Sequence, residues 1–164
     1  MISHKTKSDI NIIAIIPARG GSKGIKNKNI KLLKKIPLLV WSLIAAKREK
    51  IFDKIVVTSD SKKILDIAKK YGAESIKRSK LLSSDKAKTI DVVLDVLFKL
   101  KQKKQNPKIV VLLEPTSPFR PRGIIKKCLL ELKKKDLNQL LHALKLTEPL
   151  SIYLRKIIII LREF

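Results

Sequence analysis

The chain has 164 residues, a formal net charge of +24 and 45% hydrophobic residues. This length suits about one domain, and no apolar run approaches the roughly 20 residues of a membrane-spanning helix. The polar start of the chain lacks the apolar centre of a signal peptide, and the single cysteine, Cys128, rules out an internal disulfide. We therefore expect a cytoplasmic protein without membrane attachment.

The strong positive charge has two interpretations. A basic chain is typical of proteins that bind nucleic acids or membrane surfaces. However, the chain has 31 lysines against 7 arginines, together with 24 isoleucines, which is the bias that AT-rich codons produce. The lysines are spread along the whole chain, and 4% aromatic residues provide few platforms for base stacking. We expect no specific nucleic-acid partner, and a basic nucleic-acid-binding protein stays open as an alternative.

Strands and helices are expected to alternate along the chain, after a disordered leader over residues 1–9. The expected strands cover residues 10–17, 54–59, 74–77, 108–113 and 139–146. The expected helices cover residues 37–46, about 61–72, 89–100 and 123–134. Proline opens the first helix, Asp60 or Ser61 caps the second, and Thr89 caps the third. No element is assigned beyond Thr147.

This alternation predicts a three-layer α/β fold. Most of the expected strands are apolar on both faces, which is typical of a mostly parallel sheet covered on both sides. Ligands of such sheets bind at the carboxyl ends of the strands. The polar loops 18–29, 58–61 and 114–122 follow strand ends, so we expect them to line one crevice.

The long loop after the first strand carries the strongest functional signal. Its sequence, ARGGSKG over residues 18–24, places three glycines beside Arg19 and Lys23. Glycines let backbone N–H groups approach an anion, and the two cations can bind phosphate. The spacing is neither a dinucleotide fingerprint nor a Walker A motif. The loop predicts a phosphate cradle.

Four segments in this order resemble the signature of the acylneuraminate cytidylyltransferases, or CMP-sialic acid synthetases. They are residues 18–24 with 28–30 (KNI), residues 56–60 (VVTSD), Arg78 with 82–85 (LSSD) and Thr89, and residues 112–120 (LLEPTSPFR). The resemblance covers about residues 10–135. It implies a nucleotide-diphospho-sugar transferase-like fold, with a nucleotide-binding domain over residues 10–146 and a divergent tail over 147–164.

The resemblance also implies a reaction. The family transfers CMP from CTP to a nine-carbon acidic sugar, such as sialic, legionaminic or pseudaminic acid, releases pyrophosphate and uses Mg²⁺. By this match Arg19 and Lys23 are the catalytic residues that hold the triphosphate. The residues that the match assigns to nucleotide are Ala18, Gly20, Gly21, Ser22, Asn29, Arg78, Thr89 and Glu114, with Glu114 reading cytosine or bordering the sugar. Those assigned to the sugar are Ser117 and Arg120.

The chain also departs from the family pattern. Glu114 stands where glutamine is usual, which leaves an acceptor-only side chain. The asparagine–glycine–alanine segment and the aspartate pair that binds Mg²⁺ are missing, and Asp60 and Asp85 are the nearest substitutes, each favoured as structural. We expect a C-terminally truncated chain that does not form the family's homodimer. An inactive remnant that binds nucleotide without turnover is a second alternative.

Overall fold

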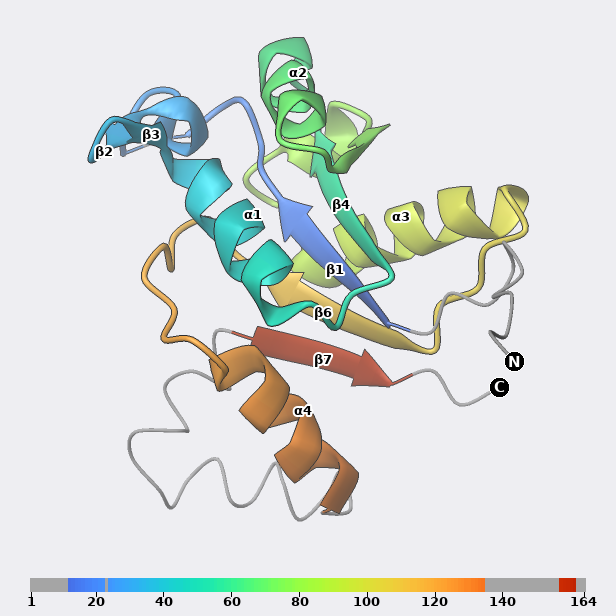
Figure 1. The fold of residues 1–164 in the computed structure, drawn as a ribbon. Coiled ribbons are helices and arrows are strands. Elements are labelled where there is room, and N and C mark those ends of the chain that lie inside the picture. Colours follow the sequence, from blue (N-terminus) through green and yellow to red (C-terminus); the bar gives the residue numbers. More distant parts are fainter. Residues whose placement is uncertain (1–11, 23, 135–156, 162–164) are drawn as a thin grey trace.

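The computed structural model describes residues 12–22, 24–134 and 157–161 of the chain. A five-stranded sheet lies at the centre (Figure 1). Its strands, in the order in which they lie side by side, are β5 (Glu74–Lys77), β4 (Lys54–Ser59), β1 (Ile12–Pro17), β6 (Ile109–Leu113) and β7 (Ile157–Leu161). The first four are parallel, and β7 pairs antiparallel with β6.

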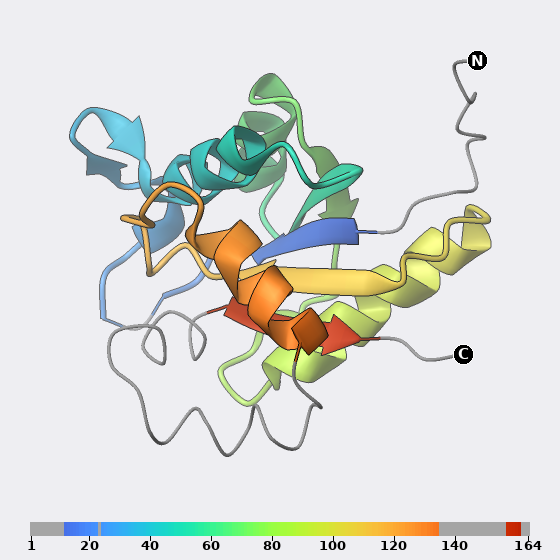
Figure 2. The ribbon, with the colours of Figure 1, turned by 60° about the horizontal axis from the view of Figure 1, so that its bottom comes forward.

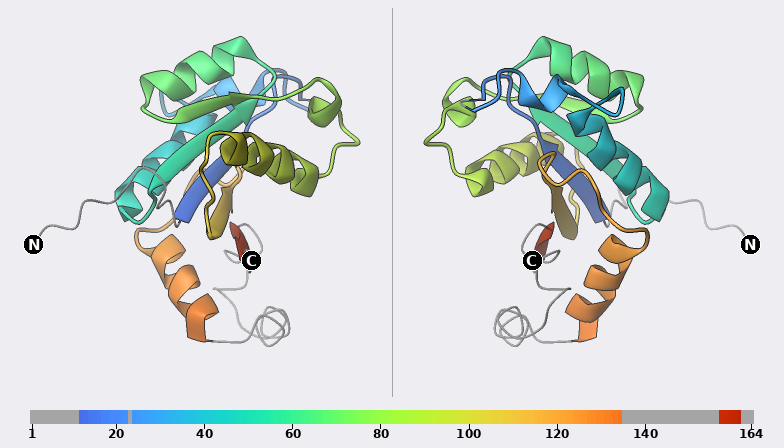
Figure 3. Two further views of the ribbon diagram at one scale, coloured as in Figure 1. Left: turned by 90° about the vertical axis from the view of Figure 1, so that its right-hand side faces the viewer. Right: turned by 90° about the vertical axis from the view of Figure 1, so that its left-hand side faces the viewer.

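Helices cover both faces of this sheet, as Figures 2 and 3 show. One face carries α1 (Leu38–Glu49), α2 (Lys62–Lys70) and α4 (Ile124–Lys134), and the other carries α3 (Thr89–Gln102). The predicted three-layer α/β fold is therefore confirmed.

Alternate residues of β1 point into two separate buried clusters. Ala14 and Ile16 pack with residues of α1, α2 and α4, whereas Ile13 and Ile15 pack with residues of α3. All four are fully buried, because a central parallel strand has one hydrophobic layer on each side. This explains why the β1 sequence is a continuous apolar run rather than an alternating one.

Most of the predicted elements are confirmed within a few residues, and β4 and β5 have the predicted bounds. Ser61 precedes α2 as its N-cap residue, although its side chain makes no capping bond among the described residues. The expected capping role of Thr89 is wrong, since Thr89 is the first residue of α3 and Lys88 stands at the cap.

The expected loop over residues 18–37 contains more structure than the sequence suggests. It holds a 3₁₀ turn, η1 (Lys28–Ile30), and a short hairpin of β2 (Leu32–Leu33) and β3 (Ile36–Pro37). The two residues of the hairpin turn, Lys34 and Lys35, have φ of 49° and 63°. Such turns are usually built from Asn-Gly, so the Lys-Lys pair gives no hairpin signal. Pro37 belongs to β3, and α1 therefore begins one residue later than predicted.

The end of the chain holds a strand that the sequence left unassigned, β7, at one edge of the sheet. The leader over residues 1–9, the expected strand over residues 139–146 and the domain boundary at 146 lie outside the described residues. Within the described part of the chain, no helix has both the length and the hydrophobicity to cross a membrane.

Candidate functional site

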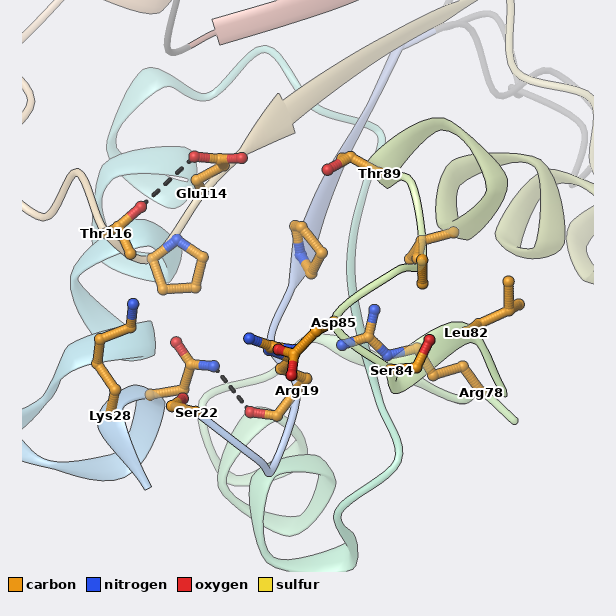
Figure 4. A pocket seen from close by; sticks show the side chains of 15 residues that line it. Arg19, Ser22, Lys28, Arg78, Leu82, Ser84, Asp85, Thr89, Glu114 and Thr116 are labelled. Carbon is orange, nitrogen blue, oxygen red and sulfur yellow. Dashed lines mark hydrogen bonds and ion pairs between the residues drawn. The ribbon is translucent and has the colours of Figure 1, made fainter. Parts of the chain in front are cut away.

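A pocket of about 310 Å³ opens at the carboxyl ends of the parallel strands (Figure 4). Three segments form its walls: the loop after β1, the segment between β5 and α3, and the loop after β6. The described lining residues are Pro17, Arg19, Ser22, Lys28, Asn29, Arg78, Leu82, Ser84, Asp85, Ala87, Thr89, Val92, Glu114, Pro115 and Thr116.

The backbone around Arg19 is held by neighbours from different elements. The Ala18 N–H donates to the Thr58 carbonyl at 3.0 Å, and the Asn29 side-chain amide donates to the Arg19 carbonyl at 2.9 Å. The following N–H, that of Gly20, donates to the Asp60 carboxylate at 2.8 Å. These bonds fix where the Arg19 side chain starts, while its guanidinium pairs with Asp85 across the pocket.

Gly20 has a steric reason to be glycine. A Cβ atom there would lie 3.0 Å from the Ser61 Cβ, whereas a Cβ at Gly21 or Gly24 would meet nothing within 4 Å.

The expected crevice needs one correction, because the predicted loop 58–61 is absent from the described lining. Asp60 and Ser61 of the predicted loop 58–61 support the glycine loop from behind, and the segment between β5 and α3 supplies the third wall in their place.

Arg78 is a buried cation in that third wall. It is 6% exposed, and its backbone N–H donates to the Ser59 carbonyl at 3.0 Å. Burial lowers the pKa of Arg78 below its ordinary value; Asp60 opposes this shift, and the cation of Arg19 adds to it. Its Nε atom has no hydrogen-bond partner among the described residues. Two arginines thus border one pocket, which favours an anionic ligand.

Glu114 lines the opposite side, where β6 ends (Figure 4). Its carboxylate accepts a hydrogen bond from the Thr116 hydroxyl at 3.4 Å. Its backbone carbonyl is held from behind by the Ser42 hydroxyl at 3.3 Å, the Ser117 N–H at 3.2 Å and an Arg120 nitrogen at 2.8 Å. The loop after β6 is therefore anchored to α1, which carries Ser42.

Arg120 lies behind the loop rather than in the described lining of this pocket. It is 6% exposed, and it also donates to the Ser42 hydroxyl at 3.0 Å. Burial lowers the pKa of Arg120 to about 10, while Glu114 acts in the opposite direction. It borders a second hollow, which includes Trp41 and Phe119. Its contacts are those of a residue that supports Glu114.

The structure brings six predicted site residues together in the pocket lining: Arg19, Ser22, Asn29, Arg78, Thr89 and Glu114. Ala18, Gly20 and Gly21 belong to the adjoining loop, where Ala18 is fully buried. Ser117 and Arg120 are absent from the described lining, and Lys23 lies outside the described residues. These positions show where the residues lie, and their roles in binding stay predictions.

The sequence reasoning overlooked other residues of the lining. Lys28 stands next to Asn29, but a chain with 31 lysines gives no reason to single one out. Thr116 became visible as a site residue only through its bond to Glu114. Asp85 was expected to be structural rather than a metal ligand, but the sequence did not indicate its partner, Arg19.

The described residues contain no cluster of metal-binding side chains. Mg²⁺ prefers carboxylate and other oxygen ligands, yet no group of three His, Cys, Asp or Glu side chains that could hold a metal occurs in the described ranges. Asp60 accepts the Gly20 N–H, and Asp85 pairs with Arg19. Both candidate substitutes are therefore engaged in structural contacts.

A mostly parallel sheet with a glycine-containing loop and two arginines at its carboxyl ends has the architecture of the α/β nucleotide-binding proteins. Comparison with known sequences narrows this class: the chain belongs to the cytidylyltransferase family, whose sequence model matches residues 13–153.

Individual relatives agree with this assignment. A CMP-N,N'-diacetyllegionaminic acid synthase from Legionella pneumophila is 44% identical over 112 residues, covering 68% of this chain and 48% of that protein. An N-acylneuraminate cytidylyltransferase from Escherichia coli is 37% identical over 142 residues, covering 87% of this chain and 29% of that protein. The chain thus spans half or less of the length of these relatives.

A solved structure shares the fold. The structure of a CMP:2-keto-3-deoxy-manno-octonic acid synthetase complexed with CTP matches with a TM-score of 0.65 at 17% identity, covering 76% of this chain and 48% of that one.

Proposed function

We propose that the pocket binds CTP and that the protein transfers CMP to a sialic-acid-like nine-carbon acidic sugar. The convergence of Arg19 and Arg78, from two different walls, on one pocket at the strand ends carries this proposal. Membership of the cytidylyltransferase family supports CTP as the nucleotide. The names of the relatives, which refer to acylneuraminate and diacetyllegionaminic acid, support the sugar class.

The proposed chemistry depends on positioning and charge. The anomeric hydroxyl oxygen of the sugar bonds to the α-phosphorus of CTP as the bond to the bridging oxygen breaks. Pyrophosphate leaves with that electron pair, and the hydroxyl proton is released. Arg19, with Lys23 as the second predicted cation, would hold the phosphates in line and neutralise the developing charge. The fixed backbone on both sides of Arg19 suits this role.

Glu114 would select a hydrogen-bond donor. Its carboxylate accepts hydrogen bonds and donates none when ionised, and Thr116 already donates to one oxygen. We propose that its remaining acceptor capacity serves the amino group of cytosine or a hydroxyl of the sugar. Ser117 and Arg120 would then act on the substrate through Glu114, whose carbonyl they hold.

The remaining expectations are also proposals. The resemblance implies Mg²⁺, and we propose that the ion enters with the triphosphate, because Mg²⁺ is usually bound through substrate phosphates and few protein carboxylates. We propose a cytoplasmic location, because a single buried thiol suits a reducing compartment.

Calorimetric titration with CTP tests the nucleotide site. We expect Arg19→Ala to weaken CTP binding by about 1.5–3 kcal/mol, the scale of a hydrogen bond to a charged group. Lys26→Ala is the control, since Lys26 is an exposed cation in the same loop outside the described lining. Loss of affinity in both variants, or no binding of CTP by the wild type, would contradict the assignment.

Turnover is tested separately by pyrophosphate release from CTP in the presence of magnesium and N-acetylneuraminic or diacetyllegionaminic acid. Release that depends on the sugar supports the transferase. CTP binding without any release would instead identify a nucleotide-binding remnant.

A further inference from the structure

We propose that Asp85 is a positioning residue that holds the guanidinium of Arg19 inside the pocket. This inference rests on the proposed function, because it assigns Arg19 to the phosphates of the nucleotide. Asp85 itself would touch Arg19 rather than the reacting atoms.

The ion pair joins two walls of the pocket. Arg19 comes from the loop after β1, and Asp85 comes from the segment between β5 and α3, 66 positions further along the chain. Figure 4 shows the two side chains meeting between these walls. Their side chains are 33% and 40% exposed, so surrounding protein only partly confines them. A long arginine side chain at that exposure needs a partner to keep one orientation.

The neighbourhood of Arg19 makes this partner necessary. Arg78, which is 6% exposed, lines the same pocket. Arg19 is close enough for its positive charge to contribute to the lowering of the Arg78 pKa. Two guanidinium groups that lie close enough for this effect repel one another. Arg78 is confined by its burial, so the more exposed Arg19 is the side chain that would swing towards solvent. The Asp85 carboxylate offsets this repulsion.

Asp60, whose carboxylate also acts on Arg78, is engaged elsewhere. Asp60 accepts the Gly20 N–H at 2.8 Å, which fixes it behind the loop. Asp60 therefore holds the backbone next to Arg19, and Asp85 holds the end of the side chain. The two acids act on different parts of the same loop.

Removal of the Asp85 carboxylate should affect phosphate binding in opposite directions, depending on whether Asp85 positions Arg19 or acts only through its charge. A carboxylate beside an anion site repels phosphate, so removing it should tighten binding if charge alone decides. If Asp85 positions Arg19, its removal weakens binding. We expect Asp85→Asn to weaken binding of both CTP and inorganic pyrophosphate about tenfold, the scale of one lost charged contact.

Three further variants test whether the weaker binding of Asp85→Asn comes from the lost positioning of Arg19. Asp91→Asn removes the same charge from the exposed first turn of α3, outside the described lining, and should not weaken binding. In an Arg19→Ala background, Asp85→Asn should tighten binding or leave it unchanged, because no guanidinium remains to position. Asp85→Glu, which keeps the carboxylate, should restore part of the affinity.

A second measurement needs no ligand. The Nη–H signals of Arg19 in a ¹⁵N NMR spectrum, assigned by their loss in Arg19→Lys, should exchange slowly in the wild type and rapidly in Asp85→Asn, because Nη1 is the atom that donates to Asp85. If the wild type binds neither CTP nor pyrophosphate, the proposed function fails, and these signals still decide whether Asp85 holds Arg19. Unchanged Arg19 signals in Asp85→Asn, or binding that is equal or tighter, overturn the proposal.

Discussion

Gly20 follows Arg19 in the chain, and its backbone N–H donates to the Asp60 carboxylate at 2.8 Å. We expect Gly20→Ala to destabilise the fold by about 1 kcal/mol, because the new Cβ would press on the Ser61 Cβ at 3.0 Å. The displacement would also loosen the bond from the Gly20 N–H to Asp60, and CTP affinity should fall with it.

Gly21→Ala is the matched control for this prediction. Its Cβ would meet nothing within 4 Å, so the free energy of unfolding should stay close to that of the wild type. Urea denaturation and calorimetry of both variants provide the measurement. Equal effects of the two substitutions would show that the contact with Ser61 does not restrict position 20.

At the scale of elements, Glu74 ties the edge strand β5 to the rest of the sheet. Its carboxylate accepts hydrogen bonds from Lys54 of β4 at 2.6 Å and from Lys103, just after α3, at 2.8 Å. Burial alone would raise the pKa of Glu74, but the bonds from Lys103 and Lys54 outweigh it and leave the pKa below its ordinary value. Glu74 therefore stabilises the fold only while it is ionised.

This gives a stability prediction that depends on pH. A carboxylate with a lowered pKa in the folded state contributes stability above its unfolded pKa, near 4.5, and loses it as the pH falls through the lowered value. We expect Glu74→Gln to reduce the free energy of unfolding by about 1 kcal/mol at neutral pH and by little once the wild-type carboxylate is protonated.

Urea denaturation at several pH values measures this difference. Asp66→Asn is the control, since Asp66 is 50% exposed in its pair with Lys62, and exposed pairs contribute little. A deficit of Glu74→Gln that persists unchanged in acid would mean that packing, rather than charge, connects β5 to its neighbours.

For the whole molecule, the net charge of +24 comes from lysines that are spread along the chain rather than concentrated in one segment. Exposed lysines occur on α2, as at Lys62 and Lys63, and on α3 across the sheet, as at Lys101. A charge spread over both faces attracts polyanions without directing them to one groove.

We therefore expect any affinity for duplex DNA to be non-specific and to fall by about 10³-fold or more between 50 and 200 mM salt, as for a protein that contacts several phosphates. Fluorescence anisotropy with two duplexes of unrelated sequence measures this. Affinity that survives the higher salt, or that favours one duplex, would support the alternative of a nucleic-acid-binding protein.

The sequence by itself determined four of the five strands of the sheet and the helices that cover it. The strands β1 and β6 are apolar runs, and periodic apolar faces indicate α2 and α3, so local pattern and burial agree. It also pointed to Arg19, which lies in the glycine loop after β1, and the resemblance to a known family pointed to Asn29, Arg78 and Glu114, all of which line the pocket.

Only the tertiary structure decided how these residues work together. The pairing of Arg19 with Asp85, and the support of Glu114 by Arg120, join residues 66 and 6 positions apart through side-chain directions that no spacing encodes. The Lys-Lys turn of the hairpin gives no local turn signal, and only the fold shows that the apolar run of β7 pairs antiparallel with β6. Long-range contacts select these arrangements, since their stabilising free energy exists only after the chain has folded.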